Sequence, residues 1–193
     1  MINRQPMWIT MPTINLVAIL PSPARVMSTS LNPIFSSDAK NILICTPDNR
    51  VKLWDVDSKK ETRNYVERRH LSHTYTCWAR SHASKGELGL CAAGTSDGSI
   101  IVWDLSRGVV LKEIEVSGET PSDLAFSKDS KTLYIAASMN KIDLYDISSG
   151  ELRGGLKAGK KAVSRLCLNP KADVIAVGRW EKKSFYVYAL DLY

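Results

Sequence analysis

A chain of 193 residues that is 44% hydrophobic and 24% charged has the composition of an ordinary globular protein, long enough for one substantial core. These values exclude wholesale disorder and a fibrous repeat. The formal net charge of +6 is compatible with nucleic acid or another acidic partner, but it is too modest to establish either.

The first thirty residues carry no acidic side chain and none of the repeat described below. Their apolar run, Ile14 to Leu20, ends at Pro-Ser-Pro and is too short to span a bilayer. It is at the lower limit for a signal peptide, and its prolines disfavour an amphipathic transit helix. Met27 is a candidate start of the biological chain. We interpret residues 1–30 as a poorly specified leader, with an organelle address as the alternative.

Four segments share one pattern, in which two apolar strands flank a polar turn and a tight turn leads into a third strand. They run from Phe35 to Val56, Cys77 to Leu105, Leu124 to Ile147 and Leu166 to Leu190. Their aromatic anchors, Trp54, Trp103, Tyr145 and Tyr188, recur at intervals of roughly 40–50 residues. This period, with a Trp-Asp ending, is typical of the four-stranded blades of a β-propeller.

The turn and strand residues agree with this interpretation. Asp97-Gly98 lies between β-rich runs and is a strong hairpin signal, and Asp48-Asn49 and Met139-Asn140 occupy the same place in the first and third units. The third strands are rich in β-branched and aromatic residues. A fourth strand follows in units one to three, for example Val109 to Glu115. No long helical period appears.

The repeat therefore predicts an all-β WD-repeat β-propeller of about four diverged blades over residues 31–193, with units near 31–73, 74–121, 122–162 and 163–193. The Gly-His dipeptide that usually precedes a WD blade is missing before the third and fourth units. We therefore expect its buried network with the Trp and the turn Asp to be incomplete. Closed propellers usually have more blades, and the fourth unit stops after its third strand. We therefore expect these blades to be part of a larger, seven-bladed type of ring.

Particular strings within the repeats resemble one family in their order and spacing. They are His70 to Cys77, Ala92 to Ile100, and Val163 to Pro170 with Gly178-Arg179. They resemble successive blades of the nucleolar WD-repeat-containing protein 43 family, the vertebrate counterpart of the fungal U three small-nucleolar-RNA-associated protein five. The resemblance implies a nuclear, nucleolar subunit of the small-subunit processome that supports pre-rRNA transcription and 18S rRNA maturation. It also implies binding to pre-ribosomal RNA and to sister propeller proteins.

Basic residues concentrate in the connections between units and in the second-to-third turns, which share one face of a WD blade. We call these residues the basic rim: Arg50, Arg68, Arg69, His70, Lys141, Lys160, Lys161, Arg179, Lys182 and Lys183. Acids are fewer there: Asp48, Glu67, Asp97, Glu119 and Glu181. Lys and Arg on one rim predict phosphate contacts to RNA without base reading, or contacts to a partner. The alternative is a solvated charged surface.

No pattern indicates catalysis, a metal or a cofactor, and we predict a non-enzymatic protein. The string Gly154 to Lys161 fits G-x4-G-K but lacks the Ser or Thr that holds magnesium and precedes a strand, so we interpret it as a basic loop between blades. The only metal-like cluster is His70, His73, Cys77 and His82, without a second cysteine pair. All four cysteines lie in apolar runs and are interpreted as small buried residues in a reducing compartment.

The leading hypothesis is a ribosome-assembly scaffold whose partners are other WD-repeat processome subunits and pre-ribosomal RNA, with no membrane and no small-molecule substrate. The alternative is a generic WD adaptor, such as a ubiquitin-ligase substrate receptor. Such receptors often carry Trp-Asp-x-Arg, whereas this chain has Ser106 at the last position and Arg107 one residue late. A propeller hydrolase would need polar residues converging on the central channel, which the sequence does not indicate.

Overall fold

The computed structural model describes residues 32–46, 50–66, 73–84, 86–116, 119–137, 140–158, 162–169, 174–179 and 186–189. Every regular element in these ranges is a β-strand. The same ranges contain no helix that is long and apolar enough to cross a membrane. The strands form four antiparallel sheets, three of four strands and one of three. The prediction of an all-β, blade-type fold is confirmed.

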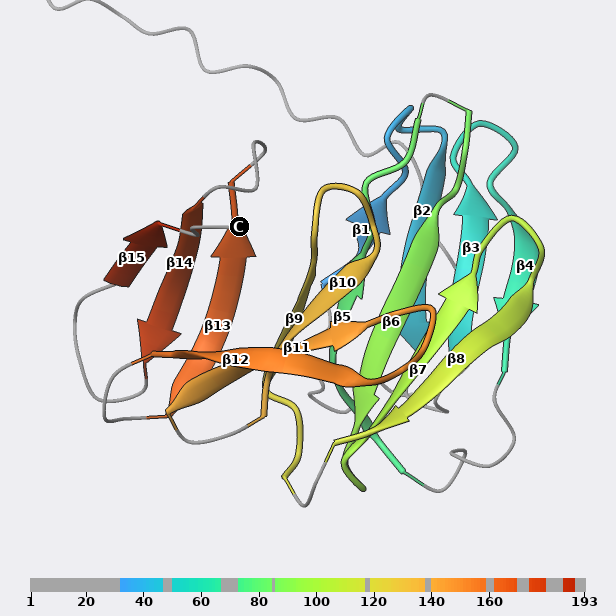
Figure 1. Cartoon of the computed structure of the whole chain (residues 1–193). Coiled ribbons are helices and arrows are strands. Elements are labelled where there is room, and N and C mark those ends of the chain that lie inside the picture. The colour runs from blue at the N-terminus through green and yellow to red at the C-terminus, as the bar shows by residue number, and fades with distance from the viewer. Residues whose placement is uncertain are drawn as a thin grey trace, which may run out of the picture.

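Within each sheet the strands follow one another in chain order as a simple meander. The first sheet has β1 (Ile34–Phe35), β2 (Asn41–Thr46), β3 (Arg50–Asp55) and β4 (Lys60–Tyr65). The second has β5 (Tyr75–Arg80), β6 (Leu90–Thr95), β7 (Ser99–Asp104) and β8 (Val109–Glu115). The third has β9 (Asp123–Phe126), β10 (Thr132–Ala136), β11 (Lys141–Asp146) and β12 (Leu152–Lys157). The fourth has β13 (Val163–Leu168), β14 (Val174–Arg179) and β15 (Tyr186–Ala189). Figure 1 shows the sheets side by side in chain order.

The anchor aromatics occupy equivalent places in the sheets. Trp54, Trp103 and Tyr145 are each the penultimate residue of their third strand, and all three are buried. Each follows a shift of register against the outer strand, the mark of a β-bulge. Tyr188 lies on β15, the third strand of its sheet. The repeat in the sequence therefore corresponds to a repeat in how the strands pair within each sheet.

Two of the turns between first and second strands make the same hydrogen bonds. The Ser36 hydroxyl donates to Oδ1 of Asp38 at 2.6 Å and accepts from the Asn41 amide at 2.9 Å. Ser127 in the third sheet donates to Asp129 and accepts from the amide five residues on, at the same two distances, 2.6 and 2.9 Å. The residue after each aspartate has a left-handed φ, of 57° and 59°. This shared turn follows from the shared Phe-Ser-x-Asp-x-Lys string.

The aspartate after each anchor stabilises the turn into the outer strand. Oδ1 of Asp55 accepts one backbone amide of that turn at 2.7 Å. Oδ1 of Asp104 accepts two, at 2.9 and 2.8 Å, and Oδ1 of Asp146 accepts two, at 2.8 and 2.9 Å. The Ser148 hydroxyl, these turn amides and the nearby Arg153 guanidinium hold the pKa of Asp146 at about 2. The Trp-Asp signature is thus a structural turn motif here.

Both faces of the second sheet are covered by neighbouring sheets. In β7, Ile101 and Trp103 belong to the core shared with the first sheet, whereas Ile100 and Val102 belong to the core shared with the third. Successive side chains of a strand point to opposite faces, so a strand covered on both sides must be apolar throughout. This explains the run Ile-Ile-Val-Trp at residues 100–103.

The hydrogen-bond network that a WD blade forms between its Trp and its turn Asp is incomplete in the second sheet. Nε2 of His73 lies 3.6 Å from Oδ2 of Asp97, and the Thr95 hydroxyl donates a hydrogen bond to Asp97. Within the described residues, however, Nε1 of Trp103 has no hydrogen-bond partner. The Trp103 ring packs edge-on against Tyr75, with ring centroids 6.0 Å apart. Packing, rather than a hydrogen-bond network, therefore holds this anchor.

The four cysteines are free thiols in different environments. Cys77 and Cys91 are buried, Cys45 is half-buried and Cys167 is exposed. The interpretation of all four as buried residues is thus wrong for Cys167. In β13 the preceding Leu166 faces the third sheet, so strand alternation turns Cys167 to the other side.

We expect thiol alkylation at neutral pH to modify Cys167 fastest and to leave Cys77 and Cys91 unmodified. Burial raises the pKa of both buried thiols to about 12, and only the thiolate reacts. Mass spectrometry after brief iodoacetamide treatment measures this, and all four cysteines should react in denaturant. Modification of Cys77 or Cys91 before Cys167 would contradict the packing of the second sheet.

A buried hydrogen bond links the first two sheets, and we expect Tyr65→Phe to show its contribution. The Tyr65 hydroxyl donates to the Leu105 carbonyl at 2.7 Å. Its loss should lower the free energy of unfolding by about 1 kcal/mol, measured by urea denaturation. The control is Asn64→Ala on the same strand, where the exposed side chain should change stability by less than about 0.5 kcal/mol. Equal effects of the two substitutions would rule out this contact.

The stabilisation contributed by Asp146 should depend on pH. Its pKa is lowered in the folded protein from 3.8 to about 2, so the charged form stabilises the fold above about pH 4. That contribution is lost as the pH falls through 2. Asp146→Asn removes it, so wild type and variant should converge in free energy of unfolding between pH 5 and pH 2. A difference that is constant over this range would be inconsistent with the turn network.

Candidate binding surfaces

The second-to-third turns and the connections between sheets lie at the same end of the blades, which we call the hairpin end. The Ser96 amide donates to the Thr74 carbonyl at 2.9 Å, and the Val116 amide donates to the Gly98 carbonyl at 2.9 Å. In the third sheet the Ala158 amide donates to a carbonyl of the corresponding turn at 2.8 Å. Each connection is thus hydrogen-bonded to the hairpin turn beside it.

The structure describes three residues of the basic rim. Arg50 begins β3, Lys141 begins β11 and Arg179 ends β14, so all three backbones lie at the hairpin end. Seven rim residues lie outside the described residues: Arg68, Arg69, His70, Lys160, Lys161, Lys182 and Lys183.

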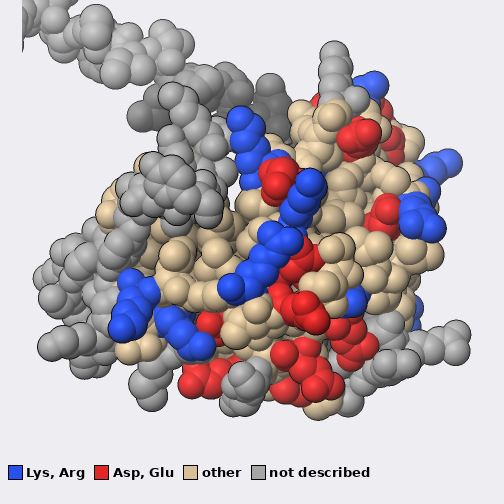
Figure 2. All heavy atoms as spheres, viewed as in Figure 1, with Lys and Arg blue, Asp and Glu red and all other residues tan. Residues whose placement is uncertain are grey.

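Part of the rim's positive charge is compensated. Nζ of Lys141 lies 2.9 Å from Oδ1 of the buried Asp143. This hydrogen bond and the charge of Asp143, with a smaller contribution from Glu119, raise the pKa of Lys141. Figure 2 shows Lys and Arg interspersed with Asp and Glu over the described part of one face of the molecule. Lys141 therefore contributes less free positive charge than the sequence alone suggests.

The two motifs considered for metal and phosphate binding are not assembled in the described chain. Cys77 lines one cavity and His82 lines another, and the described residues hold no group of three or more metal-ligating side chains. Gly154 and Gly155 lie inside strand β12, so the interpretation of this stretch as a loop is wrong as far as Lys157. The pairing of β12 with β11 holds these glycines extended.

The first strands β5, β9 and β13 lie side by side and form the inner surface of the blade arc, joined by repeated hydrogen bonds. The Thr76 hydroxyl donates to the Pro121 carbonyl at 2.7 Å, and the Ser122 hydroxyl donates to the Val163 carbonyl at 2.8 Å. Oδ2 of Asp123 accepts the Leu166 amide at 2.7 Å. Burial raises the pKa of Asp123, while the two amides that it accepts oppose that rise. These bonds place side chains from different sheets around common cavities.

One cavity, of about 260 Å³, lies where the first strands begin, and we call it the Arg165 cavity. Its wall contains Asn32, Ile34, Thr76, Cys77, Trp78, Ser122, Asp123 and Arg165, and so draws on all four sheets and the segment before β1. It contains both a guanidinium and a carboxylate. Nη1 of Arg165 donates to the Ser164 carbonyl at 2.8 Å and to the Ser122 carbonyl at 3.4 Å. The polar groups that line the Arg165 cavity therefore mainly form hydrogen bonds that join the sheets.

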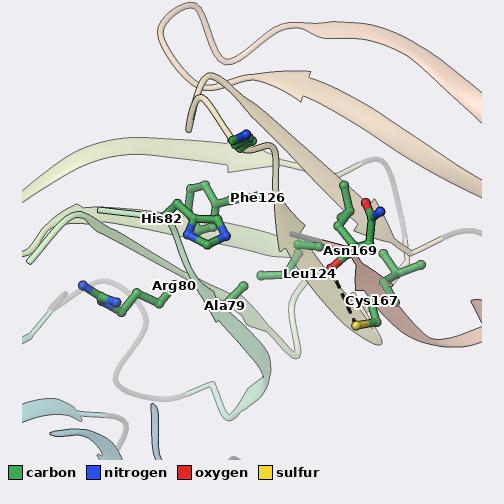
Figure 3. A pocket seen from close by; sticks show the side chains of 11 residues that line it. Ala79, Arg80, His82, Leu124, Phe126, Cys167 and Asn169 are labelled. Carbon is green, nitrogen blue, oxygen red and sulfur yellow. Dashed lines mark hydrogen bonds between the residues drawn. The ribbon is translucent and has the colours of Figure 1, made fainter. Parts of the chain in front are cut away.

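A second cavity, of about 230 Å³, lies where the first strands end, and we call it the Lys128 cavity. It is lined by Ala79, Arg80, His82, Leu124, Ala125, Phe126, Lys128, Leu166, Cys167, Leu168 and Asn169. In Figure 3, Arg80, His82 and Phe126 lie on one side and Cys167 and Asn169 on the other, with Leu124 between them. No sequence pattern indicated that these residues form a common site, although His82 belongs to the metal-like cluster considered above. The sequence signal that could have indicated this site is a polar residue at or just after the end of a first strand: Arg80 in β5, Lys128 after β9 and Asn169 after β13.

A third cavity, of about 570 Å³, lies on the outer side between the second and third sheets. Leu90, Leu111, Ser130, Lys131, Asp146, Ile147, Ser148 and Arg153 line it. Its principal charged groups are already paired, because Arg153 forms an ion pair with Asp146.

Two family models match the chain. The anaphase-promoting complex subunit 4 WD40 domain matches residues 86–171, and the WD domain, G-beta repeat, matches residues 15–55. The first covers most of the second and third sheets and the start of the fourth. The second begins inside the segment assigned above to the leader and ends with β3.

The chain is also similar to several curated proteins. It is 30% identical over 161 residues to autophagy-related protein 16 of Arabidopsis thaliana, covering 81% of this chain and 30% of that protein. It is 22% identical over 153 residues to WD repeat-containing protein 43 of Homo sapiens, covering 68% and 23%. It is 28% identical over 142 residues to small ribosomal subunit protein RACK1 of Neurospora crassa, covering 70% and 42%.

The chain spans less than half the length of each of these relatives. The matches nevertheless agree with one another, because both family models describe WD repeats. The repeat period, the four meander sheets with their equivalent anchors and the two WD models lead to the same assignment. This chain belongs to the WD-repeat family and is built of β-propeller blades.

Proposed function

We propose that this chain is a non-enzymatic scaffold in assembly of the small ribosomal subunit, acting in the nucleolus as a component of the small-subunit processome. It holds pre-ribosomal RNA and sister propeller proteins and supports pre-rRNA transcription and 18S rRNA maturation. The observation that carries the proposal is the likeness to human WD repeat-containing protein 43 over 153 residues. The likeness to a protein named as small ribosomal subunit protein RACK1 points in the same direction.

Each of the strings that resemble the WD-repeat-containing protein 43 family has described residues near the hairpin end, although Val163 to Leu168 also runs along β13 to the opposite end. The string 70–77 leads into β5, and the string 92–100 contains the hairpin between β6 and β7. Arg179, in the last string, ends β14 at the same hairpin end. The three described rim residues, Arg50, Lys141 and Arg179, also have their backbones at this end. Features that suggest the family and features that suggest phosphate contact therefore overlap there.

RNA binding by this rim is expected to be electrostatic. The backbones of Arg50 and Arg179 lie at the hairpin end, while Lys141 is partly neutralised by Asp143. Lys and Arg on a rim contact phosphates and carry no base-specific information. Affinity should therefore depend steeply on salt and weakly on RNA sequence.

The alternative is a generic WD adaptor that serves as a subunit of another multiprotein complex, such as a ubiquitin-ligase substrate receptor. The match to the anaphase-promoting complex subunit 4 WD40 domain favours it. Mass spectrometry of proteins co-purifying with the tagged chain separates the two functions. Processome subunits and early pre-ribosomal RNA support the first, and ligase subunits without RNA support the second.

We expect reversal of Arg68, Arg69, Lys160 and Lys161 to Glu to weaken binding to a single-stranded pre-rRNA fragment. Each lost phosphate contact lowers the slope of log affinity against log salt by about 0.7. Loss of four contacts should therefore reduce that slope by about 3, measured by fluorescence anisotropy between low and moderate salt. Association with early pre-ribosomal particles should fall in parallel, with an unchanged circular dichroism spectrum.

The matched control reverses Lys59, Lys60, Arg107 and Lys131. It makes the same change in net charge on exposed residues of the first-to-second and third-to-fourth turns. Because these turns lie at the other end of the blades, RNA binding should change much less. Binding by the wild type that does not respond to salt, or equal losses in both quadruple variants, would exclude the rim as the RNA site.

A further inference from the structure

We propose that the Lys128 cavity binds an extended acidic peptide that places one apolar side chain in the cavity. This inference goes beyond the proposed function, because the cavity lies away from the basic rim. Arg80, Phe126 and Leu168 are the last residues of β5, β9 and β13, so the cavity is at the opposite end of the first strands from the hairpin end.

The volume of the cavity limits the size of the group that can bind in it. Its volume of about 230 Å³ is smaller than the roughly 300–1,000 Å³ of pockets that enclose a drug-sized ligand or cofactor. One large aliphatic or aromatic side chain fits such a space. Leu124, Phe126 and Leu166 form buried walls, whereas Ala125 and Leu168 are half-buried and stay accessible to a ligand. The walls therefore suit an apolar anchor.

The charges around the cavity favour acidic groups in the remainder of the ligand. Among the described residues of its lining, every ionisable side chain other than the Cys167 thiol is basic: Arg80, His82 and Lys128. Lys128 and His82 are exposed. Arg80 is held in place because its Nε donates to the Leu88 carbonyl at 2.9 Å. A peptide with carboxylates on either side of its apolar anchor matches this arrangement.

Three described carboxylates, those of Asp129, Asp38 and Glu87, accept backbone amides within turns. Oδ1 of Asp129, next to Lys128, accepts from the Lys131 amide at 3.1 Å. Oδ1 of Asp38, whose charge acts on Arg80, accepts from the Lys40 amide at 3.1 Å. Oε2 of Glu87 accepts the Ser84 amide at 3.3 Å. None of these carboxylates lines the cavity.

The other two cavities do not share this character. The Arg165 cavity contains the carboxylate of Asp123, which disfavours an acidic ligand. The outer cavity contains the ion pair of Arg153 with Asp146. RNA suits the Lys128 cavity less well than a peptide, because phosphate binding needs a row of exposed cations and gains nothing from an apolar wall. The Lys128 cavity is therefore the one fitted to an acidic, apolar-anchored peptide.

Cys167 provides a measurement of occupancy, since this residue lines the cavity and is exposed. The full chain carrying Cys45→Ser is alkylated with iodoacetamide in the presence of a heptapeptide with a central leucine and six aspartate or glutamate residues. We expect the saturating peptide to slow Cys167 alkylation at least about fivefold. Lys128→Glu should weaken the apparent peptide affinity about tenfold, and Lys128→Gln should weaken it less.

The matched control is Lys131→Glu, three residues away on the same turn but lining the outer cavity. It should change peptide affinity less than about twofold. A peptide with alanine at its centre, and one with asparagine and glutamine in place of the acids, should each protect Cys167 poorly. Circular dichroism and melting temperature confirm that each variant is folded.

Several outcomes overturn the proposal. They are no protection by the acidic peptide at millimolar concentration, equal protection by the uncharged peptide, and equal effects of Lys128→Glu and Lys131→Glu. Equal protection by an oligouridine hexamer assigns the cavity to nucleic acid instead. Failure here does not bear on the basic rim, because the two experiments change different residues and measure different ligands.

Discussion

The stacking of the four sheets depends on one constraint: a sheet with two apolar faces must be covered on both sides. The second sheet shows it most clearly, since Ile100, Ile101, Val102 and Trp103 are all at most 1% exposed. Full burial of such a side chain contributes about 1.5–3 kcal/mol. The first and third sheets supply the two covers. Stacking of blades is thus the means by which each blade becomes stable.

Stacking also brings the first strands together, because they lie at the same edge of each sheet. Polar side chains then bridge neighbouring sheets in a repeated way, as Thr76 and Ser122 do. A hydroxyl bonded to a carbonyl of the next sheet leaves few polar groups unsatisfied along this inner surface. The cavities lie between these bridges. Their linings are therefore built from positions that are distant in the chain.

The two ends of the first strands differ in chemistry. At the hairpin end, cations occur beside acids, and the Lys141–Asp143 pair shows how part of the charge is used inside the blade. At the other end, the described lining of the Lys128 cavity combines an apolar wall with basic residues and no carboxylate. The RNA proposed above and the acidic peptide proposed above are therefore assigned to opposite ends of the same blades.

The sequence alone determined the repeat, the strand order and much of the turn chemistry. The anchors Trp54, Trp103 and Tyr145 lie where the period places them, and β8 has the predicted bounds, Val109–Glu115. These features could be predicted because hairpin turns and strand alternation are local properties of a few neighbouring residues.

Only the tertiary structure decided which strand faces are covered and which distant residues meet. Alternation places Leu166 and Cys167 on opposite faces, but it does not reveal that the third sheet covers only the first of them. Likewise, Arg80, Lys128 and Asn169 share a cavity only because three sheets stack in order, although each belongs to a different repeat. These residues come together through packing between blades. A repeat pattern in the sequence specifies the strands of each blade, but it does not specify which side chains meet between neighbouring blades.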